Sequence, residues 1–223
     1  PEMSFKKYII FLVIAVALFV RFYNFTERVT FGPEQALSLI VSGNYVKEKP
    51  SLLGREYFRV TSRGHKLFTG ALSSYSLVPL QLIFNYEPIQ ITAYFVFLNI
   101  FTGLLLFLLT RKVFNFSVAV LSLIIFLFNE YMIYQSLFFW NLNYLPLVGL
   151  LAFYVLYLYY EKPKLIYAII LGGLSGVGIN LQLLFIPFAL LLLLFVFWRS
   201  KHKIKSFACF IIGAILGNFT MVF

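Results

Sequence analysis

The chain alternates between long apolar runs and short clusters of charge. The uncharged or nearly uncharged stretches are residues 8–20, 88–110, 113–160, 165–198 and 206–223. A helix needs about 20 apolar residues to cross the hydrocarbon core of a bilayer. Two of the stretches are too long for one helix, so each is predicted to form two. The pattern therefore predicts an all-α polytopic membrane protein with seven spans.

Polar residues mark where the long stretches divide. In 113–160, the sequence WNLNYLP places a turn near Asn141 and Asn143. In 165–198, the sequence GGLSGVGINLQ is predicted to break the helix and form a hairpin of two shorter helices. Arg21 follows the first run, and its side chain can extend that helix by reaching toward the interface.

The segment Leu67–Tyr86 is uncharged and 20 residues long, yet we predict that it does not cross. Compact basic clusters occur at Lys6/Lys7, Arg111/Lys112, Lys162/Lys164 and residues 199–205. Cytoplasmic loops carry an excess of Lys and Arg, so all four clusters are expected on the cytoplasmic side. An even number of spans must then separate successive clusters, and this holds only if Leu67–Tyr86 is interfacial or re-entrant. The N-terminus is accordingly expected in the cytoplasm.

This topology leaves one large outer loop, residues 22–87, with two juxtamembrane helices. The first is predicted from Pro33, which suits a first helical turn, to Ser42, before a stop at Gly43. The second is predicted over Leu67–Phe84. Seven Lys and Arg residues fall in the loop. They are either a solvated face or a site for an anion, for which a lipid phosphate is the candidate at this depth.

Composition narrows the function classes. The 223 residues are 61% hydrophobic and 12% charged, with one cysteine and no aspartate. The single cysteine excludes a disulfide framework and a cysteine metal site. The net charge of +10 is interpreted as membrane anchoring rather than nucleic-acid binding.

Several motifs, in order, resemble one family. PEQALSLIVSGNYV and PSLLGREYFRV are similar to the first outer loop of GT-C membrane glycosyltransferases of the family 39 type. These are bacterial relatives of the dolichyl-phosphate-mannose-protein mannosyltransferases and of the lipid A aminoarabinose transferase. YQSLFFWNLNYLPLVGLLAFY resembles their second outer loop, and LIYAIILGGLSGVGINLQLLFIP the hairpin that follows. The resemblance covers nearly the whole chain. Because full members carry more spans, we expect the chain to be the N-terminal portion of a longer protein.

The resemblance implies transfer of a sugar from a polyprenyl-phosphate donor to a lipid, glycan or protein acceptor, with inversion, at the outer face of the cell membrane. The family's proposed general base falls on Glu34, with Pro33 replacing the usual preceding acid and Gln35 beside it. Because Pro33 and Gln35 replace the acid and its partner, a single carboxylate must serve. The second loop has Asn141 and Asn143 where many relatives carry an acid; with Gln35 they are expected to hydrogen-bond the acceptor or sugar, but they cannot act as a base. The resemblance places the donor phosphate at Lys66, with Arg59 and Arg63 close by.

Two further residues are candidates for the site. Tyr57 is a candidate for stacking on the sugar, and Glu130 is a second candidate acid because acids inside spans are usually functional. We expect no organic cofactor and no nucleic-acid partner, and leave a divalent metal open. Two rival functions remain: a transporter or flippase for a lipid-linked substrate, and a non-catalytic truncated relative. Glu34 could also simply stabilise the first turn of its helix.

Overall fold

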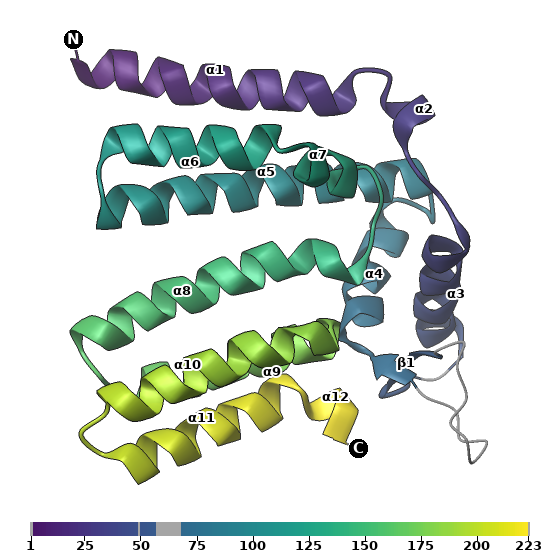
Figure 1. Ribbon diagram of the computed structural model, residues 1–223. Coiled ribbons are helices and arrows are strands. Elements are labelled where there is room, and N and C mark those ends of the chain that lie inside the picture. The colour runs from purple at the N-terminus through teal and green to yellow at the C-terminus, as the bar shows by residue number, and fades with distance from the viewer. Residues whose placement is uncertain (1, 49, 57–67, 223) are drawn as a thin grey trace. The chain divides into compact units, whose positions relative to one another are not determined.

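The computed structural model describes residues 2–48, 50–56 and 68–222 and is almost entirely helical (Figure 1). It divides into two compact units. Unit 1 comprises Pro1–Gln35 and Phe84–Asn143, and unit 2 comprises Ala36–Ile83 and Tyr144–Phe223. The candidate acid and the candidate asparagines therefore belong to the same unit.

Unit 1 is built from long helices and two short ones. They are α1 (Glu2–Phe22), α2 (Phe25–Arg28), α5 (Pro88–Val113), α6 (Phe116–Phe128) and α7 (Glu130–Ser136). Pro88 begins α5 because a first-turn residue needs no amide hydrogen. Asn115 begins α6, its side chain accepting a hydrogen bond from the amide of Val118 at 3.0 Å. Apolar residues of α1, α5 and α6 form the core: Ala17, Ile100, Phe107, Ala119, Leu123 and Leu127.

A sharp bend separates α6 from α7. The two helices meet at an angle of 57° at Asn129. The Asn129 side chain accepts a hydrogen bond from the amide of Met132 at 3.2 Å, so it starts a new helix rather than continuing the old one. Glu130 is the first residue of α7 and is exposed, so it lies at a break in the predicted span and not in the middle of a continuous helix.

The prediction that Arg21 reaches toward the interface is wrong. Arg21 is completely buried within unit 1. Its guanidinium donates to the side-chain oxygen of Asn99 at 2.8 Å and to the carbonyl of Ala17 at 3.2 Å. Helix α1 does continue through Arg21, as predicted, but the side-chain amide of Asn99 in α5 supplies its polar partner in place of the interface.

Unit 2 contains most of the outer loop and the C-terminal helices. Its elements are the main part of α3 (Pro33–Lys47), β1 (Leu53–Glu56), β2 (Phe68–Gly70), α4 (Leu72–Ile83), α8 (Leu145–Glu161), α9 (Leu165–Leu181), α10 (Ile186–Arg199), α11 (Lys203–Gly217) and α12 (Phe219–Val222). A 3₁₀ turn, Asn141–Tyr144, precedes α8, as the predicted turn requires. The strands pair antiparallel, with Leu53 opposite Gly70.

The glycines of α9 do not break the helix. Helix α9 continues to Leu181 and the chain breaks at Gln182. Gly172 and Gly176 instead face α11, where a methyl group at either would overlap the carbonyl oxygen of Phe210 or Ala214. Gly213 and Gly217 of α11 face α9 in the same manner. Small residues four apart let membrane helices approach backbone to backbone, so this stripe is a packing surface.

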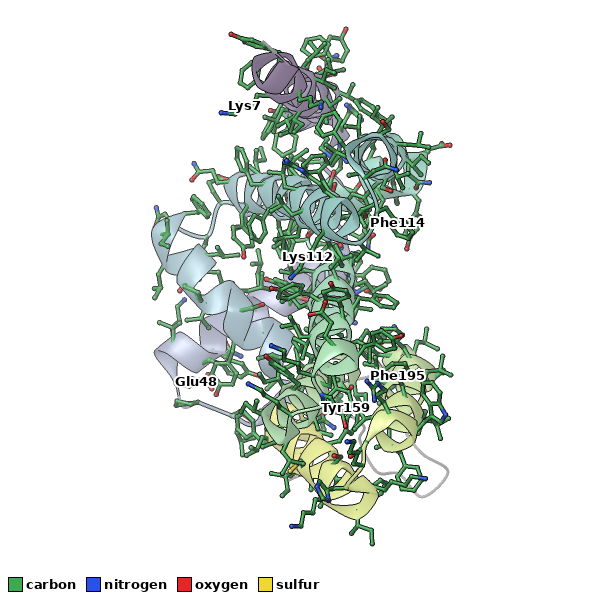
Figure 2. The ribbon with its side chains drawn as sticks, turned by 90° about the vertical axis from the view of Figure 1, so that its left-hand side faces the viewer. Lys7, Glu48, Lys112, Phe114, Tyr159 and Phe195 are labelled. Carbon is green, nitrogen blue, oxygen red and sulfur yellow. The ribbon has the colours of Figure 1, made fainter. Side chains whose placement is uncertain are left out.

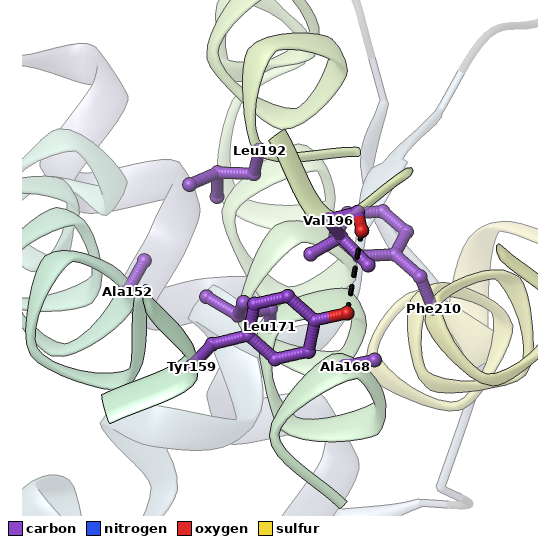
Figure 3. Packing of buried hydrophobic residues seen from close by; sticks show 7 residues of the cluster. All are labelled: Ala152, Tyr159, Ala168, Leu171, Leu192, Val196 and Phe210. Carbon is purple, nitrogen blue, oxygen red and sulfur yellow. Dashed lines mark hydrogen bonds between the residues drawn. The ribbon is translucent and has the colours of Figure 1, made fainter. Parts of the chain in front are cut away.

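The core of unit 2 lies among α8, α9, α10 and α11 (Figure 3). It contains Ala152, Tyr159, Ala168, Leu171, Leu192, Val196 and Phe210. The Tyr159 hydroxyl is completely buried and donates to the carbonyl of Val196 at 3.3 Å. This bond satisfies the polar end of a side chain that otherwise packs as a hydrocarbon.

Two helix boundaries in the outer loop differ from the predictions, and a small sheet is added. Helix α3 runs through Gly43 to Lys47, because Gly43 is buried and its packing outweighs the roughly 1 kcal/mol helix penalty of glycine. Helix α4 begins at Leu72 and not at Leu67, since Phe68–Gly70 pairs as a strand. The small sheet itself was not predicted.

Each predicted span coincides with a helix, but few of the helices are long. Within the described residues, two are long and apolar enough to cross a membrane, Pro88–Val113 and Asn141–Glu161. The bent pair α6 and α7 makes a third if it counts as one span. Helix α4 has 12 residues, about 18 Å at 1.5 Å per residue, which is shorter than the hydrocarbon core of about 30 Å. The helices indicate a membrane protein in which α4 does not cross alone.

The predicted basic clusters share an end within each unit. In unit 1, Lys7 and Lys112 lie at the same end (Figure 2), and the Lys6 ammonium lies 5.7 Å from the centre of the Phe116 ring. In unit 2, the α8–α9 and α10–α11 turns share an end (Figure 1), and the Arg199 guanidinium lies 5.5 Å from the Tyr160 ring. Two predicted clusters thus share an end within each unit, and their cytoplasmic placement stays a prediction.

Candidate functional site

The helix that carries Glu34 begins where the sequence predicts, at Pro33. The side chain of Gln35 reaches back, and its oxygen accepts a hydrogen bond from the amide of Gly32 at 3.0 Å. Its nitrogen donates to the carbonyl of Phe139 at 3.5 Å. Gln35 is buried, so this one side chain both closes the helix start and attaches it to the segment after α7.

The residues before α3 run beside that same segment. The amide of Thr30 donates to the carbonyl of Leu137 at 3.1 Å. The Phe31 and Phe139 rings are 6.1 Å apart, and Phe139 also stacks on Phe95 of α5 at 6.2 Å. Residues 30–35 are thus fixed against residues 137–139, although about one hundred positions separate them in the sequence.

Asn143 stabilises the turn that follows α7. Its amide nitrogen donates to the carbonyls of Phe138 at 2.7 Å and Gln135 at 3.0 Å. Its side-chain oxygen is buried and has no hydrogen-bond partner among the residues that the structure describes. The indole nitrogen of Trp140 is also buried, and none of the described residues accepts a hydrogen bond from it. The turn therefore offers one acceptor and one donor that protein groups leave unused.

Trp140 is a candidate that the sequence interpretation missed. The sequence did carry a signal for it. A buried tryptophan usually donates its N–H to a hydrogen-bond partner, so a tryptophan within a polar turn is a candidate donor to a ligand. Its ring lies 6.0 Å from that of Phe138.

The structure brings four predicted site residues into unit 1: Glu34, Gln35, Asn141 and Asn143. Glu34 is half-buried, and it directly precedes the residue that contacts Phe139. Asn141 begins the 3₁₀ turn two positions after Phe139. Glu34 and the two asparagines thus belong to one unit, and the Gln35–Phe139 hydrogen bond joins the segments that carry them.

Glu130 occupies a different setting. It lies on the wall of an open cleft of about 490 Å³, together with Arg28, Phe128, Ile133, Tyr134 and Leu137. No hydrogen bond joins Glu130 to Glu34, Asn141 or Asn143 in the described part of the chain, so its role as a second acid at the same site stays a prediction.

The remaining predicted site residues, Tyr57, Arg59, Arg63 and Lys66, lie outside the described residues. Among the residues that are described, no group of three His, Cys, Asp or Glu side chains is placed to hold a metal ion.

Comparison with known proteins adds no assignment. No protein family, curated protein or solved structure was found to match this chain.

Proposed function

We propose that the protein is a GT-C-type membrane glycosyltransferase that takes a sugar from a polyprenyl-phosphate donor. The observation that carries the proposal is the attachment of the α3 start to the segment after α7 through Gln35 and Phe139. It joins the first-loop acid, Glu34, to the loop with Asn141 and Asn143. The contacts that join the two loops are independent of the motif resemblance.

In the proposed reaction, the Glu34 carboxylate accepts the proton of an acceptor hydroxyl. The hydroxyl oxygen attacks the anomeric carbon from the face opposite the leaving group and forms the new glycosidic bond. The bond from that carbon to the phosphate oxygen breaks, and polyprenyl phosphate leaves with the electron pair. The anomeric configuration inverts. General base catalysis of this kind contributes about 10²–10⁴-fold in rate.

The second loop supplies hydrogen bonds to the sugar. The unpartnered Asn143 oxygen accepts from a sugar hydroxyl, and the Trp140 indole donates to a sugar oxygen. A site built to hydrogen-bond hydroxyls rejects analogues that lack them, since its buried polar groups would then stay unpaired. Lys66, Arg59 and Arg63 are assigned to the charge on the leaving phosphate by the motif resemblance.

Replacing Glu34 by glutamine tests the proposal, because the substitution keeps the size and removes the base. Membranes from cells with and without the gene are compared by mass spectrometry for polyprenyl-phosphate sugars and free polyprenyl phosphate. Loss of the protein should cause one donor to accumulate. The Glu34→Gln protein should restore turnover at a rate lower by about 10²–10⁴-fold.

Glu27→Gln is the matched control, since Glu27 is an exposed carboxylate of the same loop in α2. It should behave as the wild type. Wild-type turnover by the Glu34→Gln protein would refute the assignment. A transporter would redistribute the donor across the membrane without releasing free polyprenyl phosphate, so the same measurement separates that alternative.

A further inference from the structure

Two charges of opposite sign face the cleft at the α6–α7 bend. Arg28 comes from the short helix after α1, and Glu130 begins α7. No ion pair joins them within the described residues. One guanidinium nitrogen of Arg28 donates to the carbonyls of Val20 at 2.6 Å and Tyr23 at 3.1 Å. These bonds fix the position of the arginine and leave its other nitrogens available.

The rest of the cleft is apolar and aromatic. Phe128, Ile133, Tyr134 and Leu137 complete its wall. A ligand that suits this lining carries an anion for Arg28, a cation for Glu130, and a hydrocarbon portion for the wall.

The surroundings place the cleft at the bilayer interface. Helix α5 of the same unit is long and apolar enough to cross a membrane. Arg28 follows the C-terminal end of α1, opposite the end with Lys6 and Lys7. Tyr23, Tyr131 and Tyr134 are 60%, 57% and 55% exposed around this end. Exposed tyrosines at one level are typical of the belt that lies among lipid headgroups.

Arg21 adds positive charge in the last turn of α1, at the same end of the helix as Arg28. It is completely buried, and its described partners are a carbonyl and an amide oxygen, both neutral. A buried cation without a carboxylate partner is stabilised by an anion nearby. A phosphate on Arg28 would provide that anion at the same end of α1.

We propose that this cleft binds the headgroup of an aminophospholipid from the bilayer. The lipid phosphate accepts hydrogen bonds from Arg28, the primary ammonium donates to Glu130, and the acyl chains follow the apolar wall. The ammonium must be primary, because a quaternary amine has no hydrogen to donate to the carboxylate. This lipid site does not depend on the proposed sugar transfer, and in it Glu130 binds the lipid ammonium instead of acting as a second acid.

Native mass spectrometry tests the proposal on the intact protein. The protein is equilibrated with equal amounts of phosphatidylethanolamine, phosphatidylcholine and phosphatidylglycerol that carry identical acyl chains. The wild type should retain phosphatidylethanolamine about tenfold more than either other lipid, as expected for one hydrogen bond to a charged group. Equal retention of the three lipids would overturn the proposal.

Variants assign the two charges. Glu130→Gln should reduce retention of phosphatidylethanolamine to the level of phosphatidylcholine, whereas Glu87→Gln should not. Glu87 is the matched control, an exposed carboxylate at the start of α5 without a side-chain capping bond. Arg28→Gln should lower retention of all three lipids, and Arg28→Lys should restore part of it. If Arg28→Gln fails to fold, Glu130→Gln alone decides: an unchanged preference for phosphatidylethanolamine refutes the site.

Discussion

Replacing Gly213 by alanine should destabilise the protein, whereas the same change at Gly149 should not. Gly213 lies in α11, and a methyl group there would overlap the backbone carbonyl of Ile169 in α9. Backbone atoms cannot rotate away as a side chain can, so the two helices must separate. Gly149 lies inside α8 with no atom within 4 Å of the position of a methyl group, so alanine fits there without displacement.

The comparison isolates the packing cost. Both positions are helical, so the gain of about 1 kcal/mol in helix propensity from glycine to alanine is common to the two variants. The difference between them is then the cost of overpacking, about 1–3 kcal/mol. For a protein of this size, 1 kcal/mol lowers the melting temperature by about 2–4 °C. The Gly213→Ala protein should therefore melt about 2–12 °C below the Gly149→Ala protein.

Cys209 provides the assay. It is the one cysteine of the chain, it is half-buried in α11, and it packs against the core of unit 2. A thiol-reactive fluorophore will label it as α11 separates on heating of the purified protein in detergent. A melting temperature for Gly213→Ala equal to or above that of Gly149→Ala would show that α9 and α11 do not meet through their glycines.

Two further predictions concern the outer loop. Asn180→Ala should lower the free energy of unfolding by about 1–3 kcal/mol and speed hydrogen exchange at the Leu72 amide, because the Asn180 oxygen accepts from that amide at 3.3 Å and its nitrogen donates to Thr220 at 2.6 Å. The control is Gln182→Ala, since Gln182 is half-exposed. Equal exchange rates at Leu72 in the two variants would refute the role of Asn180 as its hydrogen-bond acceptor. Burial raises the pKa of Tyr45 above its ordinary value of 10.0, so its contribution to stability is complete below pH 10 and is lost as pH rises through the raised value. Thermal melts between about pH 9 and 12 should show this loss in the wild type and less of it in Tyr45→Phe; identical slopes would contradict it.

The positions of the helices were predictable because charge clusters separate the apolar runs. The start of α3 at Pro33 was predictable for a local reason, since proline suits the first turn of a helix. The extent of the same helix was not. Gly43 looked like a stop, but burial of that glycine decides the outcome, and burial depends on residues distant in the sequence.

Glycine also explains why the chain breaks at the last residue of GGLSGVGINLQ, Gln182, and not among its glycines. In an aqueous helix, glycine weakens the structure, so the glycines looked like the break. Between membrane helices, glycine permits close backbone contact, and the same residues become an interface with α11. Whether glycine breaks a helix or packs it against a neighbour depends on the presence of a second helix, and the sequence of one segment does not show whether a second helix lies beside it.

The candidate site was predictable only in its components. Glu34, Asn141 and Asn143 could be selected by motif, but the bond from Gln35 to Phe139 that joins their loops spans 104 positions. No local pattern encodes such a contact. Trp140 did not stand out in the sequence, because aromatic residues are abundant in this chain, with 28 Phe and 15 Tyr, and most of them serve packing.

The bend at Asn129 has a consequence for water. The amide of Met132 donates to the Asn129 side chain, so it is not available to the carbonyl of Phe128. The last carbonyls of a helix have no partner within it, and inside a bilayer they need water or protein to replace that partner. Phe128 also lines the cleft with Glu130. The carbonyl end of α6 and the Glu130 carboxylate therefore share one open cleft, so a single polar partner there, water or ligand, can satisfy both.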